Sequence, residues 1–274
     1  MICYPNCKIN LGLDILRRRE DGFHDIETLM YPVPLADILE IVPADGDEDT
    51  LSVSGNKVDC PPDKNLVMKA VRATRAVRNF PCVNIFLHKI IPDGAGLGGG
   101  SADAAFTIKL LNDIFSLGLN QSQQAEIASG IGSDCPFFIY DKPMLATGRG
   151  TDLEFADVSL KGLWILIAKP SDAHVSTAQA YAGVTPCIPE SSLISRIQRP
   201  VKEWGGCVVN MFEKSVFPQA PSVALLKNNI MEANPVFASM TGSGAAVFGI
   251  FDHEISKEHA EAICPGCFTF VARL

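Results

Sequence analysis

The sequence predicts an α+β protein built from two domains, and three observations support this. The chain has 274 residues, more than a single domain usually contains. Segments with the two-residue alternation of strands and segments with helical spacing both occur, but not as strict strand–helix repeats. A composition of 47% hydrophobic and 20% charged residues is typical of a folded chain. We expect the domain boundary near residue 152, between residues 1–152 and 153–274.

The N-terminal segment alternates as a half-buried strand does. One face carries Ile9, Leu11, Leu13 and Ile15. Lys8 and Asn10 therefore fall together on the opposite face, which we expect to be exposed. The residues Glu20-Asp21-Gly22 predict a hairpin turn with the arginines 17–19 at its solvated tip, and a second strand follows through "FHDIETLMYPV". The stretch "DILEIVPADGDEDTLSVSG" repeats the order strand, acidic turn, strand.

Helical spacing begins after this acidic turn. Residues 66–77 carry an apolar stripe, and Asn65 stands where an N-cap is expected. The strand "VNIFLHKII" and a glycine-rich loop follow, and helical spacing resumes at Ala104, Ile108, Leu111 and Phe115. Beyond "MLATGRGTDLEF" the chain returns to a mixture of strands and helices that ends on the strand "FTFVARL".

Composition excludes several classes of function. A net charge of -8 and a pI near 5.1 argue against a protein that binds nucleic-acid backbones. The longest apolar runs are too short to cross a bilayer. Nine cysteines, an odd number, without a secretory leader favour a reduced, cytoplasmic setting. Cys264 and Cys267 lack a second pair of metal ligands, so Pro-Gly between them predicts a turn rather than a metal site.

The stretch "IPDGAGLGGGSADAA" places glycines directly before a helix. The first amides of a helix have no internal partner and carry partial positive charge, so a loop without side chains lets a phosphate approach them closely. A tight turn would explain one or two glycines but not five. The loop therefore predicts a phosphate-binding site.

Two known glycine-rich patterns match this loop only in part. Gly94, Gly96 and Gly99 satisfy G-x-G-x-x-G, but the acidic residue of a dinucleotide fold does not follow at the required distance. The Walker A pattern fails because Gly100 stands where its lysine would be. A lysine must therefore come from elsewhere, and Lys8 and Lys89 are the candidates.

Other residues allow both a structural and a chemical interpretation. We expect Ser101 to cap the helix and to turn its hydroxyl toward the phosphates or their magnesium ion, while Asp103 suits the helix dipole and receives no chemical role. Asp134 in "SGIGSDCPFF" either closes a turn or acts as a general base for a hydroxyl nucleophile. The second glycine loop, in "MTGSGAAVFGIF", either lines the same cleft or turns the chain.

Three segments, taken in order, resemble the GHMP kinases: "PNCKINLGLDILRRREDGFHDIETLM", "IPDGAGLGGGSADAA" and "MTGSGAAVFGIF". The first of these, with "GSDCPFF", "GRGTDLE" and "VSTAQAY", is similar to the branch that phosphorylates a cytidine-diphosphate-linked methylerythritol in non-mevalonate isoprenoid synthesis. The resemblance implies an N-terminal ATP-binding domain with a left-handed βαβ unit and a ferredoxin-like C-terminal domain. The active site would lie in the cleft between them.

The same resemblance implies roles for individual residues. ATP with Mg²⁺ would lie along Gly94, Gly96, Gly98, Gly99, Gly100 and Ser101, with Asn65 near the adenine and Lys89 near the phosphates. Asp134 and Lys8 match the catalytic aspartate and lysine. The substrate would contact Asn10, Phe23, His24, Tyr181, Gly242 and Ser243, with aromatic rings stacking on the cytosine. Phe23 replaces a common Tyr and Ala102 a common Ser, so one hydroxyl is lost at each position.

Two alternatives stay open at this point. Another GHMP kinase, of the mevalonate or homoserine type, would use a different alcohol or acid and would not need the cytidine. A nucleotide-binding protein without catalysis would need neither Lys8 nor Asp134.

Overall fold

The structure is a computed structural model that describes residues 1–57 and 60–274. Its contacts divide the chain into two compact units. Unit 1 comprises residues 1–7, 35–93 and 98–142, and unit 2 comprises residues 8–34, 94–97 and 143–274. Each unit is assembled from separate segments, so the chain passes between the two units several times.

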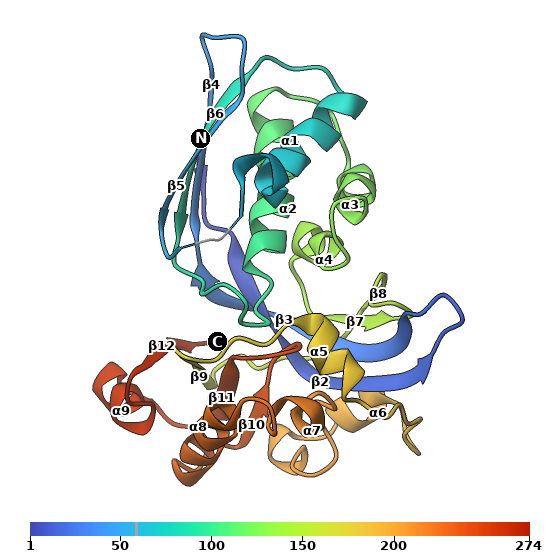
Figure 1. Ribbon diagram of the computed structural model, residues 1–274, viewed down its shortest axis with the longest axis vertical. Helices are drawn as coiled ribbons and strands as arrows, with labels where there is room; N and C mark the ends of the chain where they lie inside the picture. The colour runs from blue at the N-terminus through green and yellow to red at the C-terminus, as the bar shows by residue number, and fades with distance from the viewer. Residues whose placement is uncertain (58–59) are drawn as a thin grey trace. The chain divides into compact units, whose positions relative to one another are not determined.

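Unit 1 is a four-stranded sheet with helices on one face (Figure 1). The strand order is β1-β4-β6-β5, with bounds Ile2–Cys3, Ile38–Pro43, Val83–Lys89 and Thr50–Gly55. β5 and β6 run parallel and are joined through α1, whereas the other pairs are antiparallel. The helices are η1 (Pro62–Lys64), α1 (Leu66–Val77), α2 (Gly99–Ile114), α3 (Gln121–Ser129) and α4 (Cys135–Tyr140). Strands and helices expected from the sequence in this part are confirmed.

The core of unit 1 forms where α1 and α2 meet the sheet. The fully buried side chains Val67 and Val71 of α1 pack with Leu39, Ile41 and Ile85 of the strands. These residues repeat at helical spacing on α1 and at alternate positions on the strands, which is the pattern that predicted both elements. The same core includes Leu87 near the end of β6 and Leu110 and Leu111 of α2, so it holds together the two elements that the glycine loop connects.

Unit 2 contains two sheets. The first has the order β2-β3-β7-β8, with bounds Asn6–Arg18, His24–Ala36, Met144–Thr147 and Asp152–Phe155. The hairpin turn at residues 20–22 is confirmed, and Arg17 and Arg19 at its tip both pair with Asp25. These arginines are therefore surface residues of the hairpin, as the sequence suggested.

The second sheet of unit 2 has the order β10-β11-β9-β12, and all its pairs are antiparallel. Its bounds are Phe237–Met240, Val247–Phe251, Trp164–Pro170 and Cys267–Arg273. Helix α8 (Pro221–Glu232) connects β9 to β10 and α9 (Lys257–Ile263) connects β11 to β12, and both pack on the sheet (Figure 1). This βαββαβ order and its strand arrangement are ferredoxin-like, which confirms the expected fold. The remaining elements are α5 (Thr177–Ala182), α6 (Leu193–Ile197), η2 (Val201–Glu203) and α7 (Glu213–Val216).

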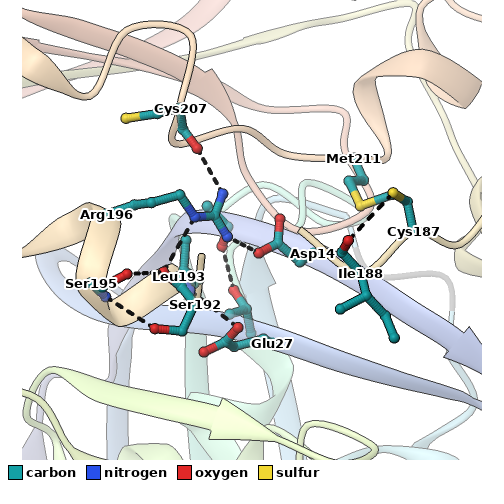
Figure 2. A network of polar contacts seen from close by, with 12 residues as sticks. Asp14, Glu27, Cys187, Ile188, Ser192, Leu193, Ser195, Arg196, Cys207 and Met211 are labelled. Carbon is teal, nitrogen blue, oxygen red and sulfur yellow. Dashed lines mark hydrogen bonds and ion pairs between the residues drawn. The ribbon is translucent and has the colours of Figure 1, made fainter. Parts of the chain in front are cut away.

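A buried ion pair fixes α6 to β2 within unit 2. Figure 2 shows the guanidinium of Arg196 reaching Asp14, and the same group donates to Cys207 O at 2.7 Å. Leu193 N, at the start of the helix, donates to Glu27 Oε2 at 3.1 Å. Asp14 is 1% exposed and Arg196 is 6% exposed, so removal of either partner would leave the other charge buried without compensation.

Two further expectations from the sequence concern ends and surfaces. Residues 265–266 form the expected turn that leads into β12, and Cys264 and Cys267 are free thiols. Across residues 1–57 and 60–274, none of the helices has both the length and the apolar character that a bilayer crossing requires.

Candidate active site

The glycine loop joins the end of β6 to the start of α2. Gly94, Gly96 and Gly98 all have positive φ, at 59°, 73° and 73°. At Gly96 the requirement is also steric, because a Cβ atom would lie 2.2 Å from Thr241 O. Only glycine can satisfy both conditions at this position. The fold itself therefore requires a residue without a side chain at this point of the loop.

The first turn of α2 presents unpaired amides. Its first helical hydrogen bond runs from Ala102 N to Gly98 O at 2.9 Å, so the amides of residues 99–101 precede the helical ladder. Gly98 occupies the N-cap position in the left-handed conformation and has no side chain with which to bind these amides. The helix end therefore keeps its donors available for an anion, which is the arrangement the sequence predicted.

Ser101 is not the N-cap, and this expectation was wrong. The left-handed conformation of Gly98 starts the helix earlier, so Ser101 lies within the first turn. Its hydroxyl instead contacts the thiol of Cys135, whose pKa burial raises to about 11. Because Cys135 follows Asp134 directly, this contact brings the Asp134 backbone close to the first turn of α2.

Asp134 occupies the N-cap position of α4, yet its side chain makes no cap hydrogen bond to that helix. Ser133 Oγ donates to Asp134 Oδ1 at 3.4 Å, and the residue is half-buried. Helix capping therefore does not account for the carboxylate. Its assignment as general base remains a prediction.

Lys8 and Asn10 of β2 do share an environment, but it is buried, and the expectation of an exposed face was wrong. They are 4% and 3% exposed, because β2 is covered on both faces. Lys8 Nζ donates to Asn10 Oδ1 at 2.6 Å and to Gly96 O at 2.9 Å. A lysine from outside the loop therefore places its ammonium on the loop backbone, which the lack of a Walker lysine required.

Several polar residues that the sequence did not single out hold this arrangement. Asn10 Nδ2 donates to Thr28 Oγ1 at 2.9 Å, and Thr241 Oγ1 donates to Asn10 Oδ1 at 3.2 Å. Both threonines are fully buried, so their hydroxyls need internal partners. The sequence position of Thr241 could have indicated its role, because this residue lies directly before the second glycine loop in "MTGSG".

The second glycine loop packs on the first. A Cβ atom at Gly242 would lie 3.0 Å from Gly96 Cα, and Asn210 Nδ2 donates to Gly242 O at 2.8 Å. Ser243 Oγ lies 3.0 Å from Thr177 Oγ1, next to the start of α5. Unit 2 therefore gathers Lys8, Asn10, Gly94, Gly96, Gly242 and Ser243 into one region.

Lys89, the other candidate lysine, is engaged elsewhere. Its ammonium contacts Asp37 and lies 2.7 Å from Asp103 Oδ2, and the residue is only 5% exposed. Burial alone would lower the pKa of Lys89, but the two carboxylates outweigh it and raise that pKa. In this arrangement the Lys89 ammonium forms ion pairs with Asp37 and Asp103. A direct contact between Lys89 and phosphate, as the sequence suggested, would require it to leave this pair.

Asn65 caps α1 as predicted. Its side chain accepts a hydrogen bond from Val67 N at 2.9 Å, and its backbone is extended. This structural role accounts for the residue, and its place near an adenine stays a prediction.

The aromatic residues lie in unit 2 as a separate group. His24 and Tyr181 stack with ring centroids 4.8 Å apart and an interplanar angle of 20°, and Tyr181 meets Phe212 edge-on. An open pocket of about 500 Å³ adjoins the first two rings and is also lined by Arg18, Gly22, Ala178, Ala182, Val184 and Pro186. Its size and its aromatic wall suit a planar ring.

Phe23 lies at the hairpin next to His24 and is 51% exposed. The Arg149 guanidinium covers its ring at 3.6 Å from the centroid. An exposed aromatic ring with one cation-covered face can still receive a flat ligand on its other face. Sequence analysis did not single out Arg149 as a partner of Phe23, because the contact joins segments far apart in the chain.

Comparison with known proteins identifies the family. A family model described as the GHMP kinases N terminal domain matches residues 65–142, which include the glycine loop and Asp134. The chain is 46% identical over all 274 residues to a 4-diphosphocytidyl-2-C-methyl-D-erythritol kinase of Parabacteroides distasonis, covering 100% of both chains. This chain belongs to that kinase family. A Bacteroides fragilis relative with the same name is also 46% identical, over 96% of this chain and 97% of its own.

Solved structures agree with the family assignment. A crystal structure of a 4-(cytidine 5'-diphospho)-2C-methyl-D-erythritol kinase superposes with a TM-score of 0.82 at 27% identity, over 99% of this chain and 98% of its own. The mevalonate kinase of Methanococcus jannaschii gives a TM-score of 0.70 at 14% identity, over 100% and 98% of the two chains. At that identity the second likeness concerns the fold alone. The GHMP kinase fold and the kinase family are therefore confirmed.

Proposed function

We propose that this protein transfers the γ-phosphoryl group of ATP to the 2-hydroxyl of 4-diphosphocytidyl-2-C-methyl-D-erythritol, a step of non-mevalonate isoprenoid precursor synthesis. The observation that carries the proposal is the 46% identity over the whole chain to relatives named for this substrate. In the described part of the chain the cysteines form no disulfide bonds, which fits the reduced interior of a cytoplasm.

The backbone of the glycine loop supports the ATP part of this proposal. The amides of residues 99–101 are available, and Gly96 leaves no room for a side chain. In the described residues there is no group of three or more His, Cys, Asp and Glu side chains that could hold a metal ion. We therefore expect Mg²⁺ to arrive with ATP and to be held largely by phosphate oxygens, with Ser101 as the nearest hydroxyl of the loop.

The chemistry would be divided between two residues. Asp134 would orient the substrate hydroxyl and accept its proton, the role that the family resemblance implies for this residue. Lys8, whose ammonium lies on Gly96 O, would stabilise negative charge on the reacting oxygens. Both contributions are positioning and electrostatics, which is what phosphoryl transfer mainly requires.

The pocket beside His24 and Tyr181 supports the cytidine part. Base stacking on aromatic side chains contributes about 1–3 kcal/mol per base. A GHMP kinase for mevalonate or homoserine would not need a pocket that stacks on a base. We therefore favour the cytidylated substrate, with Phe23, His24 and Tyr181 as its aromatic contacts and Asn10, Gly242 and Ser243 near its polar groups.

The test is a steady-state assay with ATP, Mg²⁺ and 4-diphosphocytidyl-2-C-methyl-D-erythritol that follows ADP release and product mass. We expect Asp134→Asn to lower kcat by about 10²–10⁴-fold while ADP binding is kept. Asp157→Asn, which changes an exposed acid, is the matched control and should behave as wild type. A substrate lacking the cytidine should react with a much lower kcat/KM. Equal rates on both substrates would contradict the substrate assignment, and ATP binding without turnover would favour the binding-only alternative.

A further inference from the structure

Three charged side chains meet in the interior of unit 1, close to the segments that flank the glycine loop in the chain. Lys89 ends β6, Asp37 lies between β3 and β4, and Asp103 lies in the second turn of α2. Their exposed fractions are 5%, 0% and 2%. The Lys89 ammonium contacts both carboxylates. Burying a charged side chain costs free energy, because the charge loses its contact with water. A buried group of three charges therefore calls for a structural or functional explanation.

The group ties together both ends of the glycine loop. Lys89 and Asp103 are 14 positions apart in the chain, and the loop lies between them. Asp37 Oδ1 accepts from Ile90 N at 2.5 Å and from Ile91 N at 2.8 Å, the first two amides after Lys89. Entry to the loop and the start of α2 are therefore held by one set of contacts.

The missing side chain of Gly99 also lets the ammonium approach the helix start closely. A Cβ atom at Gly99 would lie 3.3 Å from Lys89 Nζ and 3.0 Å from Ile91 Cγ2. Gly99 has ordinary helical geometry, so here the glycine serves close approach and not an unusual φ. The first residue of α2 therefore lies close to the lysine that the two carboxylates hold.

We propose that Lys89, Asp37 and Asp103 form a buried clamp that positions the phosphate-binding loop, and that Lys89 acts on the nucleotide through the loop backbone without touching the phosphates. These are positioning residues. The proposal rests on the proposed function for its ligand, since the loop is taken to bind ATP. It differs from the expectation that the family resemblance gave for Lys89.

The balance of charge in the clamp provides a way to distinguish a positioning role of Lys89 from a direct contact between Lys89 and phosphate. Lys89→Met leaves two buried carboxylates facing each other without a cation, which should distort the loop. Adding Asp103→Asn removes one of these charges, and the amide can donate to Asp37, whose carboxyl is within hydrogen-bond reach of position 103. The double variant therefore repairs the clamp but does not restore an ammonium.

The experiment measures MgADP affinity by calorimetry for wild type, Lys89→Met, Asp103→Asn and the double variant. We expect Lys89→Met to bind MgADP about tenfold more weakly and the double variant to return to within about threefold of wild type, because contacting residues couple. Lys161→Met, at an exposed lysine, is the matched control and should not change affinity. In turnover, Lys89→Met should raise KM for ATP and leave KM for the alcohol substrate unchanged.

A direct phosphate contact predicts the opposite result, a double variant at least as weak as Lys89→Met, and this would overturn the clamp. A rise of both KM values by the same factor would also overturn it, since that indicates general loss of structure. If Lys89→Met does not fold, the double variant alone decides: affinity near wild type supports the proposal and a tenfold loss contradicts it. Absence of MgADP binding by wild type would instead overturn the proposed function.

Discussion

Each unit buries a cluster of charges, and the two clusters differ in balance. In unit 2 the Arg196 guanidinium pairs with Asp14 and also donates to Cys207 O and Ser192 O (Figure 2). In unit 1 a single ammonium, that of Lys89, faces the two carboxylates of Asp37 and Asp103. The first cluster buries one charge of each sign, with the half-buried Glu27 beside it, whereas the second buries two negative groups against one ammonium.

The difference appears in the carboxylates themselves. Burial raises the pKa of Asp14, while its hydrogen bond to Arg196 counters the rise. Burial raises the pKa of Asp103 to about 7, because Lys89 lowers it only in part and Asp37 raises it further. Asp103 Oδ1 is buried and has no hydrogen-bond partner within the described part of the chain. A balanced pair thus fastens a helix, whereas an unbalanced cluster takes up a proton near neutral pH.

The largest effect should come from breaking the balanced pair. Arg196→Met leaves Asp14 buried without a cation, and we expect a loss of about 3–5 kcal/mol in the free energy of unfolding. Urea denaturation measures it. The control is Arg199→Met, which changes an exposed arginine two residues after the end of α6. It should change the free energy of unfolding only slightly. A loss below about 1 kcal/mol for Arg196→Met would mean that the pair is not desolvated in solution.

The next largest effect concerns the contact between the clamp and α2. Gly99→Ala would force its methyl group against Ile91 and Lys89, and overpacking of this kind costs about 1–3 kcal/mol. Gly100→Ala is the matched control, since its Cβ would lie 3.7 Å from Leu66 Cδ1, an ordinary contact, and should be neutral or stabilising. Thermal unfolding of both variants gives the comparison. Equal stability of the two would show that Lys89 is not packed beneath Gly99.

The unbalanced cluster should also be visible in the pH dependence of stability. The pKa of Asp103 rises from 3.8 to about 7 on folding, so the folded state holds the proton more tightly. Its contribution to stability is present below pH 3.8 and is lost as pH rises through 7. Relative to wild type, Asp103→Asn should gain at least about 1.4 kcal/mol between pH 5 and pH 8, the equivalent of about one pKa unit. Urea midpoints at the two pH values measure this, and a constant difference would contradict it.

The smallest effect is expected at an exposed pair, which provides the reference for both clusters. Lys257 Nζ and Glu261 Oε1 lie 3.8 Å apart on α9, and both side chains are largely in solvent. Lys257→Met should change the free energy of unfolding by less than about 0.5 kcal/mol. A larger change in thermal unfolding would mean that surface pairs matter here and that burial does not set the difference.

Much of the fold and part of the site could be predicted from the sequence. Local patterns were sufficient for α1, whose apolar stripe and Asn65 cap are as expected, and for the glycine loop before α2. These features depend on neighbours in the chain. The ferredoxin-like order of unit 2 came from resemblance and not from spacing, because strand pairing is a long-range property.

The error at Lys8 and Asn10 has a long-range physical cause. Polar residues alternating with apolar ones predicted an exposed face for Lys8 and Asn10, but both are buried. Lys8 donates to Gly96 O, and Thr28 and Thr241 bond Asn10 in the interior. No local pattern reports that a polar side chain will find buried partners from distant segments. The same holds for Asp37 and Asp103, whose joint contact with Lys89 exists only once the chain has folded.

The central claim is that phosphate is transferred to the 2-hydroxyl, and the ³¹P spectrum of the product tests it most directly. The carbon at position 2 of the methylerythritol carries a methyl group and no hydrogen, so a phosphate placed there has no three-bond proton coupling. Incubation of the protein with ATP, Mg²⁺ and 4-diphosphocytidyl-2-C-methyl-D-erythritol should give a new phosphomonoester resonance that remains a singlet without proton decoupling. A doublet or triplet would place the phosphate on another hydroxyl. Absence of any new phosphomonoester would contradict the account.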